Sequence, residues 1–256
     1  MDVTSNSESY GVSLSHPFYR LPGQSLSGTV TLERRRSNTF LLGLPFSFSP
    51  GVQNGESSVT VIRIGQEWLH RSTEQVFAVR SIFNIGIDAL DATINQHAPD
   101  GRFFSWLGQL QWARHVRSGQ IIWRADVQLT DDPLLPLEKF QIGGANSVRG
   151  YRENQIVRDW GFSSSLEYRQ PLFNNFFGPN KFFVAPFADV GGAWNTDDNT
   201  ANSQDLLVSI GLGVIWEPDR RLHSHVYWGK GLINVNNPDN DPQDYGFHFK
   251  VSGQFF

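Results

Sequence analysis

Apolar and polar residues alternate with a period of two along almost the whole chain, and the alternation is clearest over 206–216. Successive side chains on a β-strand point to opposite faces, so a segment of this kind has one apolar and one polar face. The opposite parity of 206–216 is mostly small or polar. The apolar parity consists of Leu206, Val208, Ile210, Leu212, Val214 and Trp216.

The alternation predicts about eleven β-strands, and no helix is evident. Most of these strands are about 9 to 12 residues long, which suits a tilted strand that crosses a bilayer, whereas soluble strands most often have about 5 or 6 residues. The predicted strands cover 8–15, 26–35, 58–69, 76–87, 103–116, 120–129, 162–172, 182–194, 206–216, 222–231 and 245–256.

The connections between the predicted strands alternate in length. Those at 70–75, 116–119 and 217–221 are short, and those at 36–57, 88–102, 131–161, 195–205 and 232–244 are long. Short turns on one side of the membrane and long loops on the other are typical of bacterial outer-membrane barrels. The sequence therefore predicts an all-β fold, an antiparallel transmembrane β-barrel, with a secreted β-sandwich as the alternative.

The composition supports a sheet and restricts the function. Twenty Phe, 8 Trp and 24 Gly are residues of strands and turns. Cysteine is absent, so thiolate metal sites and cysteine nucleophiles are excluded. A formal net charge of -4 disfavours nucleic acid as a partner. No run approaches the roughly 18 apolar residues of a spanning helix, which excludes a helical membrane protein.

Two motifs carry candidate chemistry. A long loop contains Gly-Gly-Ala-Asn-Ser-Val-Arg-Gly-Tyr at 143–151, and Phe-Ala-Asp-Val-Gly-Gly follows at 187–192. The glycines of the first motif permit the positive φ angles of a compact loop tip. Arg149 offers a planar fork of donors that suits a carboxylate, and the alternation places Asp189 on the inward face of its strand.

These motifs resemble those of the two-partner secretion transporters, the hemolysin secretion/activation proteins of the ShlB/FhaC/HecB type, and the resemblance covers essentially the whole chain. It includes 100–104 (Asp-Gly-Arg-Phe-Phe) and 134–138 (Leu-Leu-Pro-Leu-Glu). It implies that the loop tip folds back into the barrel lumen, where its arginine pairs with the aspartate of a barrel-wall motif. The implied site residues are Gly143, Gly144, Val148, Arg149, Gly150 and Tyr151 at the loop tip, and Phe187, Asp189 and Gly191 on the wall.

The end of the chain fits the C-terminal signal that barrels present to their assembly machinery, in which aromatic and apolar residues alternate toward a terminal Phe. One parity holds up to Phe255, and Phe256 is one residue out of register, so either of them is a candidate for the terminal aromatic. The residues of the signal are Tyr245, Phe247, Phe249, Val251, Phe255 and Phe256.

The resemblance also implies a longer parent protein, with a barrel of about sixteen strands that follows two periplasmic POTRA domains. An open sheet would leave unpaired backbone groups in lipid, which is very costly. We therefore expect residues 1–256 to be the C-terminal portion of the barrel, with the POTRA domains and the first strands absent.

By resemblance, the function is an outer-membrane pore that exports, and activates, a large unfolded exoprotein such as a hemolysin. The expected partners are this exoprotein, outer-membrane lipids and, during insertion, the barrel-assembly machinery. A barrel-assembly insertase of the same superfamily and a passive porin are the alternatives.

No cofactor, metal site or enzymatic activity is expected. His223 and His225 share a strand face without a third ligand at a recognisable spacing. The loop at 239–244 has alternating oxygen ligands but lacks the glycine and the closing glutamate of a calcium loop, so we interpret it as a solvated loop. The sequence contains no hydrolase, nucleotide-binding or zinc-protease motif. The basic run at 34–36, at the mouth of a strand, is interpreted as surface charge, either facing lipopolysaccharide or in a loop, with a contact with the transported protein as the alternative.

Overall fold

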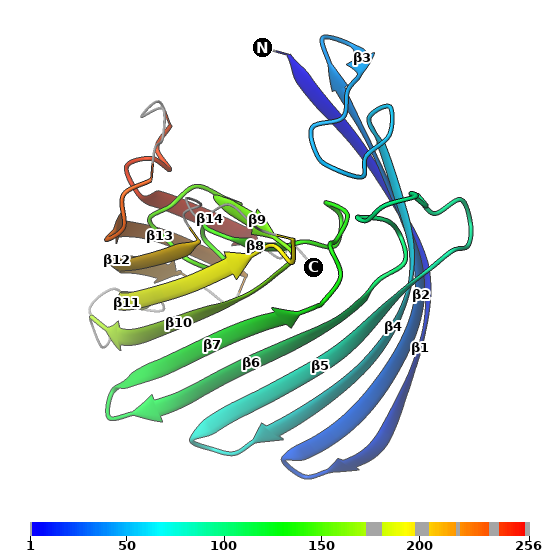
Figure 1. Cartoon of the computed structure of the whole chain (residues 1–256). Coiled ribbons are helices and arrows are strands. Elements are labelled where there is room, and N and C mark those ends of the chain that lie inside the picture. The colour runs from blue at the N-terminus through cyan, green and yellow to red at the C-terminus, as the bar shows by residue number, and fades with distance from the viewer. Residues whose placement is uncertain (1, 173–180, 198–204, 219–220, 236–240, 254–256) are drawn as a thin grey trace.

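A computed structural model of the chain describes residues 2–172, 181–197, 205–218, 221–235 and 241–253. It contains one large antiparallel sheet, which curls around an interior (Figure 1), and a small sheet of two strands. The large sheet consists of β1 (Val3–Leu21), β2 (Gln24–Leu41), β3 (Leu44–Pro45), β4 (Glu56–Arg71), β5 (Gln75–Ile87), β6 (Phe104–Val116), β7 (Gly119–Leu129), β10 (Trp160–Pro171), β11 (Lys181–Trp194), β12 (Leu206–Glu217), β13 (Leu222–Gly231) and β14 (Phe247–Gly253). The small sheet pairs β8 (Phe140–Ile142) with β9 (Ile156–Arg158).

The prediction of an all-β antiparallel fold is confirmed. Apart from the short β3, which pairs with β2, the strands of the large sheet lie in chain order from β1 to β14, and each overlaps a predicted strand. β1 and β14 are the two ends of this order, and no pairing joins them among the described residues. No described segment is a helix with the length and apolar character needed to cross a membrane.

The first hairpin is longer than predicted. β1 and β2 extend over 3–21 and 24–41, so the loop expected at 36–57 begins as a strand. Apolar alternation stops where these strands become rich in Ser, Asn and Thr, yet the backbone ladder continues, with Ser7 paired to Ser37 in register. Hydrophobic patterning therefore detects only the part of each strand with an apolar face, and it misses a polar extension held by backbone hydrogen bonds.

The last strand is shorter than predicted. β14 begins at Phe247, and Tyr245 lies in the turn that precedes it, where the Phe247 backbone N–H donates to the carbonyl of Pro242. Gly246 in this turn has φ +79°, which a strand residue does not adopt. Phe255 and Phe256 lie outside the described residues.

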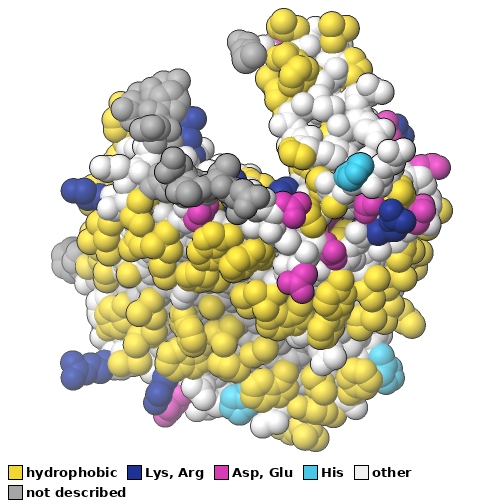
Figure 2. All heavy atoms as spheres, in the orientation of Figure 1, with side chains coloured by type: hydrophobic (Ala, Val, Ile, Leu, Met, Phe, Trp, Pro, Cys, Tyr) yellow, Lys and Arg dark blue, Asp and Glu magenta, His cyan; other side chains and the backbone are white. Residues whose placement is uncertain are grey.

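The apolar face of the sheet points outward. Ile210, Leu212 and Val214 are about half exposed, as expected for side chains that no second layer covers. Figure 2 shows hydrophobic side chains in a broad band over the visible outer face, with charged side chains mainly along its margins. A transmembrane barrel has such a band, whereas a sandwich buries its apolar rows, so the sandwich alternative is excluded.

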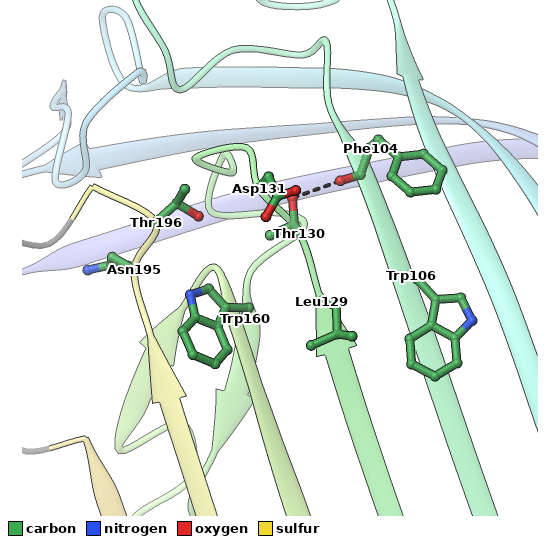
Figure 3. A pocket seen from close by; sticks show the side chains of 8 residues that line it. All are labelled: Phe104, Trp106, Leu129, Thr130, Asp131, Trp160, Asn195 and Thr196. Carbon is green, nitrogen blue, oxygen red and sulfur yellow. Dashed lines mark hydrogen bonds between the residues drawn. The ribbon is translucent and has the colours of Figure 1, made fainter.

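Aromatic side chains mark one rim of this band. The Trp160 and Trp194 rings stack with centroids 4.7 Å apart. Beside them lies an outer cleft of about 750 Å³, in which apolar side chains meet polar ones from the loops above (Figure 3). Aromatic belts of this kind lie at the interface between hydrocarbon and water. The cleft is lined by Phe104, Trp106, Leu129, Thr130, Asp131, Trp160, Asn195 and Thr196.

The buried core lies inside the curled sheet. The segment between β7 and β10, expected as a loop, carries β8 and β9 and packs against the inner wall in two places. One cluster joins the loop to β11 and β12 and contains Phe140, Ile142, Val148, Tyr151, Ile156, Ala193 and Leu207. The other joins it to β4 and contains Val59, Val61, Phe103, Leu134 and Leu135.

Candidate functional site: the lumenal loop and its anchors

The guanidinium of Arg149 is bound by two carboxylates of the barrel wall. Its Nε and Nη2 donate to the two oxygens of Asp189, each over 2.8 Å. Its Nη1 donates to Glu167 Oε2 on β10 over 2.5 Å, and the Arg149 backbone N–H also donates to Asp189 over 3.0 Å. The side chains are almost dry, with 6% of Arg149, 0% of Asp189 and 7% of Glu167 exposed. This is the bidentate geometry of strong, charge-assisted hydrogen bonds.

Aromatic rings complete the pocket around Arg149. Its Cζ lies 3.6 Å from the ring centroid of Phe187 and 4.7 Å from that of Tyr227, within cation–π range. Burial alone would lower the pKa of Arg149, but its hydrogen bonds to Asp189 and its attraction to Asp189 and Glu167 outweigh burial and raise it. The guanidinium therefore stays charged, and its charge is compensated inside the lumen.

Glycines allow the loop to lie directly on the wall. Gly150 has φ +91°, and a Cβ added there would stand 2.9 Å from the backbone of Gly229 on β13. Gly191 on β11 leaves similar room for Val148, which is fully buried. Two further loop glycines, Gly143 and Gly144, also have positive φ. The motif glycines thus serve both the turn of the loop and its close approach to the strands.

Tyr151 and the backbone of Gly150 fix the loop to the last strands. The Tyr151 hydroxyl donates to the carbonyl of Val208 over 2.8 Å and accepts from the Ile233 backbone N–H over 3.1 Å. The backbone N–H of Gly150 donates to His248 Nε2 over 3.1 Å. The structure thus brings the loop-tip and wall motifs together.

The C-terminal motif lies apart from this cluster. Phe247, Phe249 and Val251 face outward and are half to four-fifths exposed. His248, on the opposite face of the same strand, accepts the hydrogen bond from the loop. The described aromatic residues of β14 therefore belong to the outer surface of the sheet.

Glu138 is a second anchor, and no motif predicted a role for it beyond its place in the 134–138 stretch. Nη1 and Nη2 of Arg63 on β4 donate to its two oxygens over 3.0 and 2.8 Å, and Arg35 on β2 donates to it over 3.3 Å. Arg63 also donates to Glu33 over 2.8 Å. The interpretation of Arg35 as surface charge is wrong, because Arg35 faces Glu138. Arg63 shares the strand parity of buried Val59 and Val61, which could have indicated an inward partner.

Asp159 holds the two ends of the loop together. Its Oδ1 accepts from the Leu134 backbone N–H and from Lys139 Nζ, over 3.0 and 2.6 Å, and its Oδ2 accepts from the Thr196 backbone N–H. The carboxylate is almost fully buried. It therefore satisfies backbone donors that a loop inside a barrel would otherwise leave unpaired.

The loop before β14 is also joined to the lumenal loop. Arg152 pairs with Asp244, and its Nη2 lies 2.6 Å from Asp244 Oδ2. The Asp244 side chain is fully buried, so the interpretation of 239–244 as a solvated loop is wrong for this residue. No group of three metal-ligating side chains occurs in the described part of the chain.

An antiparallel sheet with an apolar outer band and an ionic, loop-filled interior defines an outer-membrane β-barrel protein of the transporter type. The chain belongs to the haemolysin secretion/activation protein family ShlB/FhaC/HecB, whose model matches residues 1–215. This family is one of outer-membrane transporters, which confirms the resemblance found in the motifs.

Solved structures share the fold at low sequence identity. CdiB from Escherichia coli superposes with a TM-score of 0.78 at 19% identity over 97% of this chain and 45% of that chain. CdiB from Acinetobacter baumannii gives 0.72 at 19% identity, over 98% and 42%. BamA from Haemophilus ducreyi lacking POTRA domains 1-3 gives 0.66 at 11% identity, over 96% and 54%. The chain thus spans about half the length of these proteins. A comparison with curated proteins found no match.

Proposed function

We propose that the chain is part of a pore that exports a large unfolded exoprotein, such as a hemolysin, across the outer membrane by two-partner secretion. The family supports this function, and the observation that carries it is the Arg149 cluster. A loop held inside the lumen by a buried ion pair narrows the passage, and it can be released only as a unit. Arg149 and Asp189 would therefore set the position of a gate.

We further propose that residues 1–256 are the C-terminal portion of a longer barrel. The chain corresponds to 45% and 42% of the two CdiB chains, which leaves room for POTRA domains and first strands. Its partners would be the exoprotein, outer-membrane lipids and the barrel-assembly machinery. For that machinery, the exposed row of Phe247, Phe249 and Val251 would be part of the insertion signal.

The export function is tested in the complete transporter, co-expressed with its secreted partner. Arg149→Ala and Asp189→Ala are expected to reduce the amount of partner in the medium severalfold, while heat-modifiable migration shows that the barrel is still inserted. Asp126→Asn is the matched control, since Asp126 is an inward carboxylate that accepts from Gln109 and, in the described part of the chain, has no hydrogen bond or ion pair with the loop. Undiminished secretion in both loop variants contradicts the gating role.

The likeness to BamA keeps an insertase as the second candidate, although its TM-score and identity are lower than those of the CdiB structures. Depletion of the transporter separates the two functions. An insertase deficit lowers the amounts of many outer-membrane barrels, whereas an export deficit removes one secreted protein and leaves the other barrels unchanged.

A further inference from the structure

A cavity of about 230 Å³ lies beneath the loop tip, against the inner faces of β7, β10, β13 and β14. The tip contributes Ala145 and Asn146, and the wall contributes His223, beside the short connection between β12 and β13, and its register partner Ser252 on β14. In an outer-membrane barrel, short turns face the periplasm. The cavity therefore lies toward the side from which an exported chain arrives.

The lining of this cavity has one sign of charge. It includes Arg124, Arg149, Arg169 and Lys250, together with three histidines, and no carboxylate is among its described lining residues. Two of these cations are compensated by carboxylates of the wall, because Arg149 pairs with Asp189 and Arg169 pairs with Glu167 over 2.6 Å.

The other two cations are free. Arg124 and Lys250 are exposed to the lumen and have no hydrogen-bond or ion-pair partner within the described residues. Cross-strand register places Arg124 opposite Ser165, and Lys250 opposite His225, on the inner face of the sheet. Two uncompensated charges that line one cleft together attract counter-charges more strongly than isolated charges on an open surface.

We propose that this cavity is a docking site for carboxylate-bearing segments of the exported polypeptide. The inference rests on the proposed function and names the chemistry of the cargo that the pore engages first. An extended chain brings one or two acidic side chains into a space of this size, where Arg124 and Lys250 pair with them. Binding beneath the tip also places the cargo against the loop that must be displaced.

The test measures binding of labelled, extended Gly/Ser peptides to the complete transporter in detergent micelles. One peptide carries evenly spaced Glu, and the other carries Lys at the same positions. The Glu peptide is expected to bind preferentially, and binding is expected to weaken as salt is raised. In Arg124→Gln/Lys250→Gln, affinity for the Glu peptide is expected to fall roughly tenfold, since a cleft of one charge sign concentrates counter-charges about 10-fold to 10³-fold.

Arg80→Gln is the matched control. Arg80 lies on the inner face of β5, pairs in register with Glu67 and does not line the cavity. The single variants Arg124→Gln and Lys250→Gln are measured beside the double variant, and circular dichroism verifies the sheet in each. Equal loss in Arg80→Gln, no preference for the Glu peptide, or equal displacement by inorganic phosphate overturns the inference.

The outcome is separable from that of the export proposal, because peptide binding requires no secretion. If the Glu peptide binds as expected but secretion does not depend on Arg149 or Asp189, the gate is wrong and the docking site stands. If secretion depends on that pair but Arg124→Gln/Lys250→Gln binds the peptide normally, the docking site alone is wrong.

Discussion

The inner wall differs between the two ends of the sheet in how far its side chains are buried. From β10 to β13 the inner wall is covered by the lumenal loop and holds the buried ions Arg149, Glu167 and Asp189. Among the described residues, none in β1 or β2 is buried, and hydroxyl pairs such as Ser13–Thr31 link the two strands. The same strand geometry thus supports a dry ionic interior at one end and a polar wall without buried groups at the other.

The difference in burial between the two ends originates in the size of the wall side chains where the loop is seated. Where the loop is seated, the wall has glycine at Gly211 and Gly213, and a Cβ there would stand 2.4 Å from the Phe187 ring and 2.3 Å from the Tyr227 ring, respectively. These glycines let both rings lie close to the wall and face Arg149. At this end, the wall therefore receives the loop with small residues as well as with the carboxylates of Asp189 and Glu167.

The largest expected effect is at the covered end. Asp189→Asn leaves the Arg149 guanidinium buried with half of its compensation removed, and breaking a buried pair costs about 3–5 kcal/mol. Urea unfolding of the complete transporter in micelles is expected to show a loss of about 3 kcal/mol. Asp126→Asn, whose partner Gln109 is neutral, is expected to lose below about 1 kcal/mol. Equal losses would remove the contrast between the two carboxylates.

Gly150→Ala combines backbone strain with a steric clash. Its φ of +91° and the Gly229 backbone, 2.9 Å from an added Cβ, predict a loss of about 2 kcal/mol in the same unfolding experiment. Gly43→Ala near the β2–β3 end is the control, since its φ is +79° but an added Cβ meets nothing within 4 Å. The control is expected to lose about 1 kcal/mol. If Gly43→Ala is as costly as Gly150→Ala, close packing of the loop contributes nothing.

Glu138→Gln tests the anchor between the loop and the first half of the sheet. Removing the charge that Arg63 and Arg35 share is expected to destabilise the chain by about 1.5 kcal/mol, in the range for hydrogen bonds to charged groups. Limited proteolysis should also cleave 131–139 faster. Glu33→Gln is the control, because Glu33 contacts the same arginine from a more exposed position, 24% against 5%. A larger effect at Glu33 would mean that the contact between Glu33 and Arg63 within the wall, and not the contact of Glu138 with the wall, stabilises this region.

The smallest effect is expected at the open end. Ser13→Ala removes one exposed hydroxyl pair with Thr31, and surface substitutions of this kind change stability by below about 0.5 kcal/mol. Urea unfolding of this variant should overlay that of the unchanged chain. A loss above about 1 kcal/mol would mean that hydroxyl pairing is a structural requirement of the first hairpin.

Most of the strand order could be predicted from the sequence, because a membrane barrel imposes one apolar residue in every two. The rule fails where the environment changes. The polar ends of β1 and β2 have no apolar face. Tyr245 is an aromatic residue of the kind common in strands, but it lies in a turn with Gly246 at positive φ. Alternation reports contact with hydrocarbon rather than strand formation itself.

The site was predictable only in part. Arg149 and Asp189 lie in motifs with a known resemblance, but Glu138, Asp159 and Asp244 act through partners far along the chain. Glu138 lies 75 residues from Arg63, and Arg152 lies 92 residues from Asp244. Charge pairs at such separations follow from how the loop is folded inside the sheet, and one sequence contains no periodic signal for that.

The buried cluster also has consequences for the electrical behaviour of the pore. With the loop seated, the charges of Arg149 and Arg169 balance those of Glu167 and Asp189. When the loop departs, Arg149 leaves with it, and within this cluster Glu167 and Asp189 are left with Arg169 alone. The departure therefore changes the fixed charge along the conduit, so a planar bilayer recording would register it as a change in reversal potential as well as in conductance.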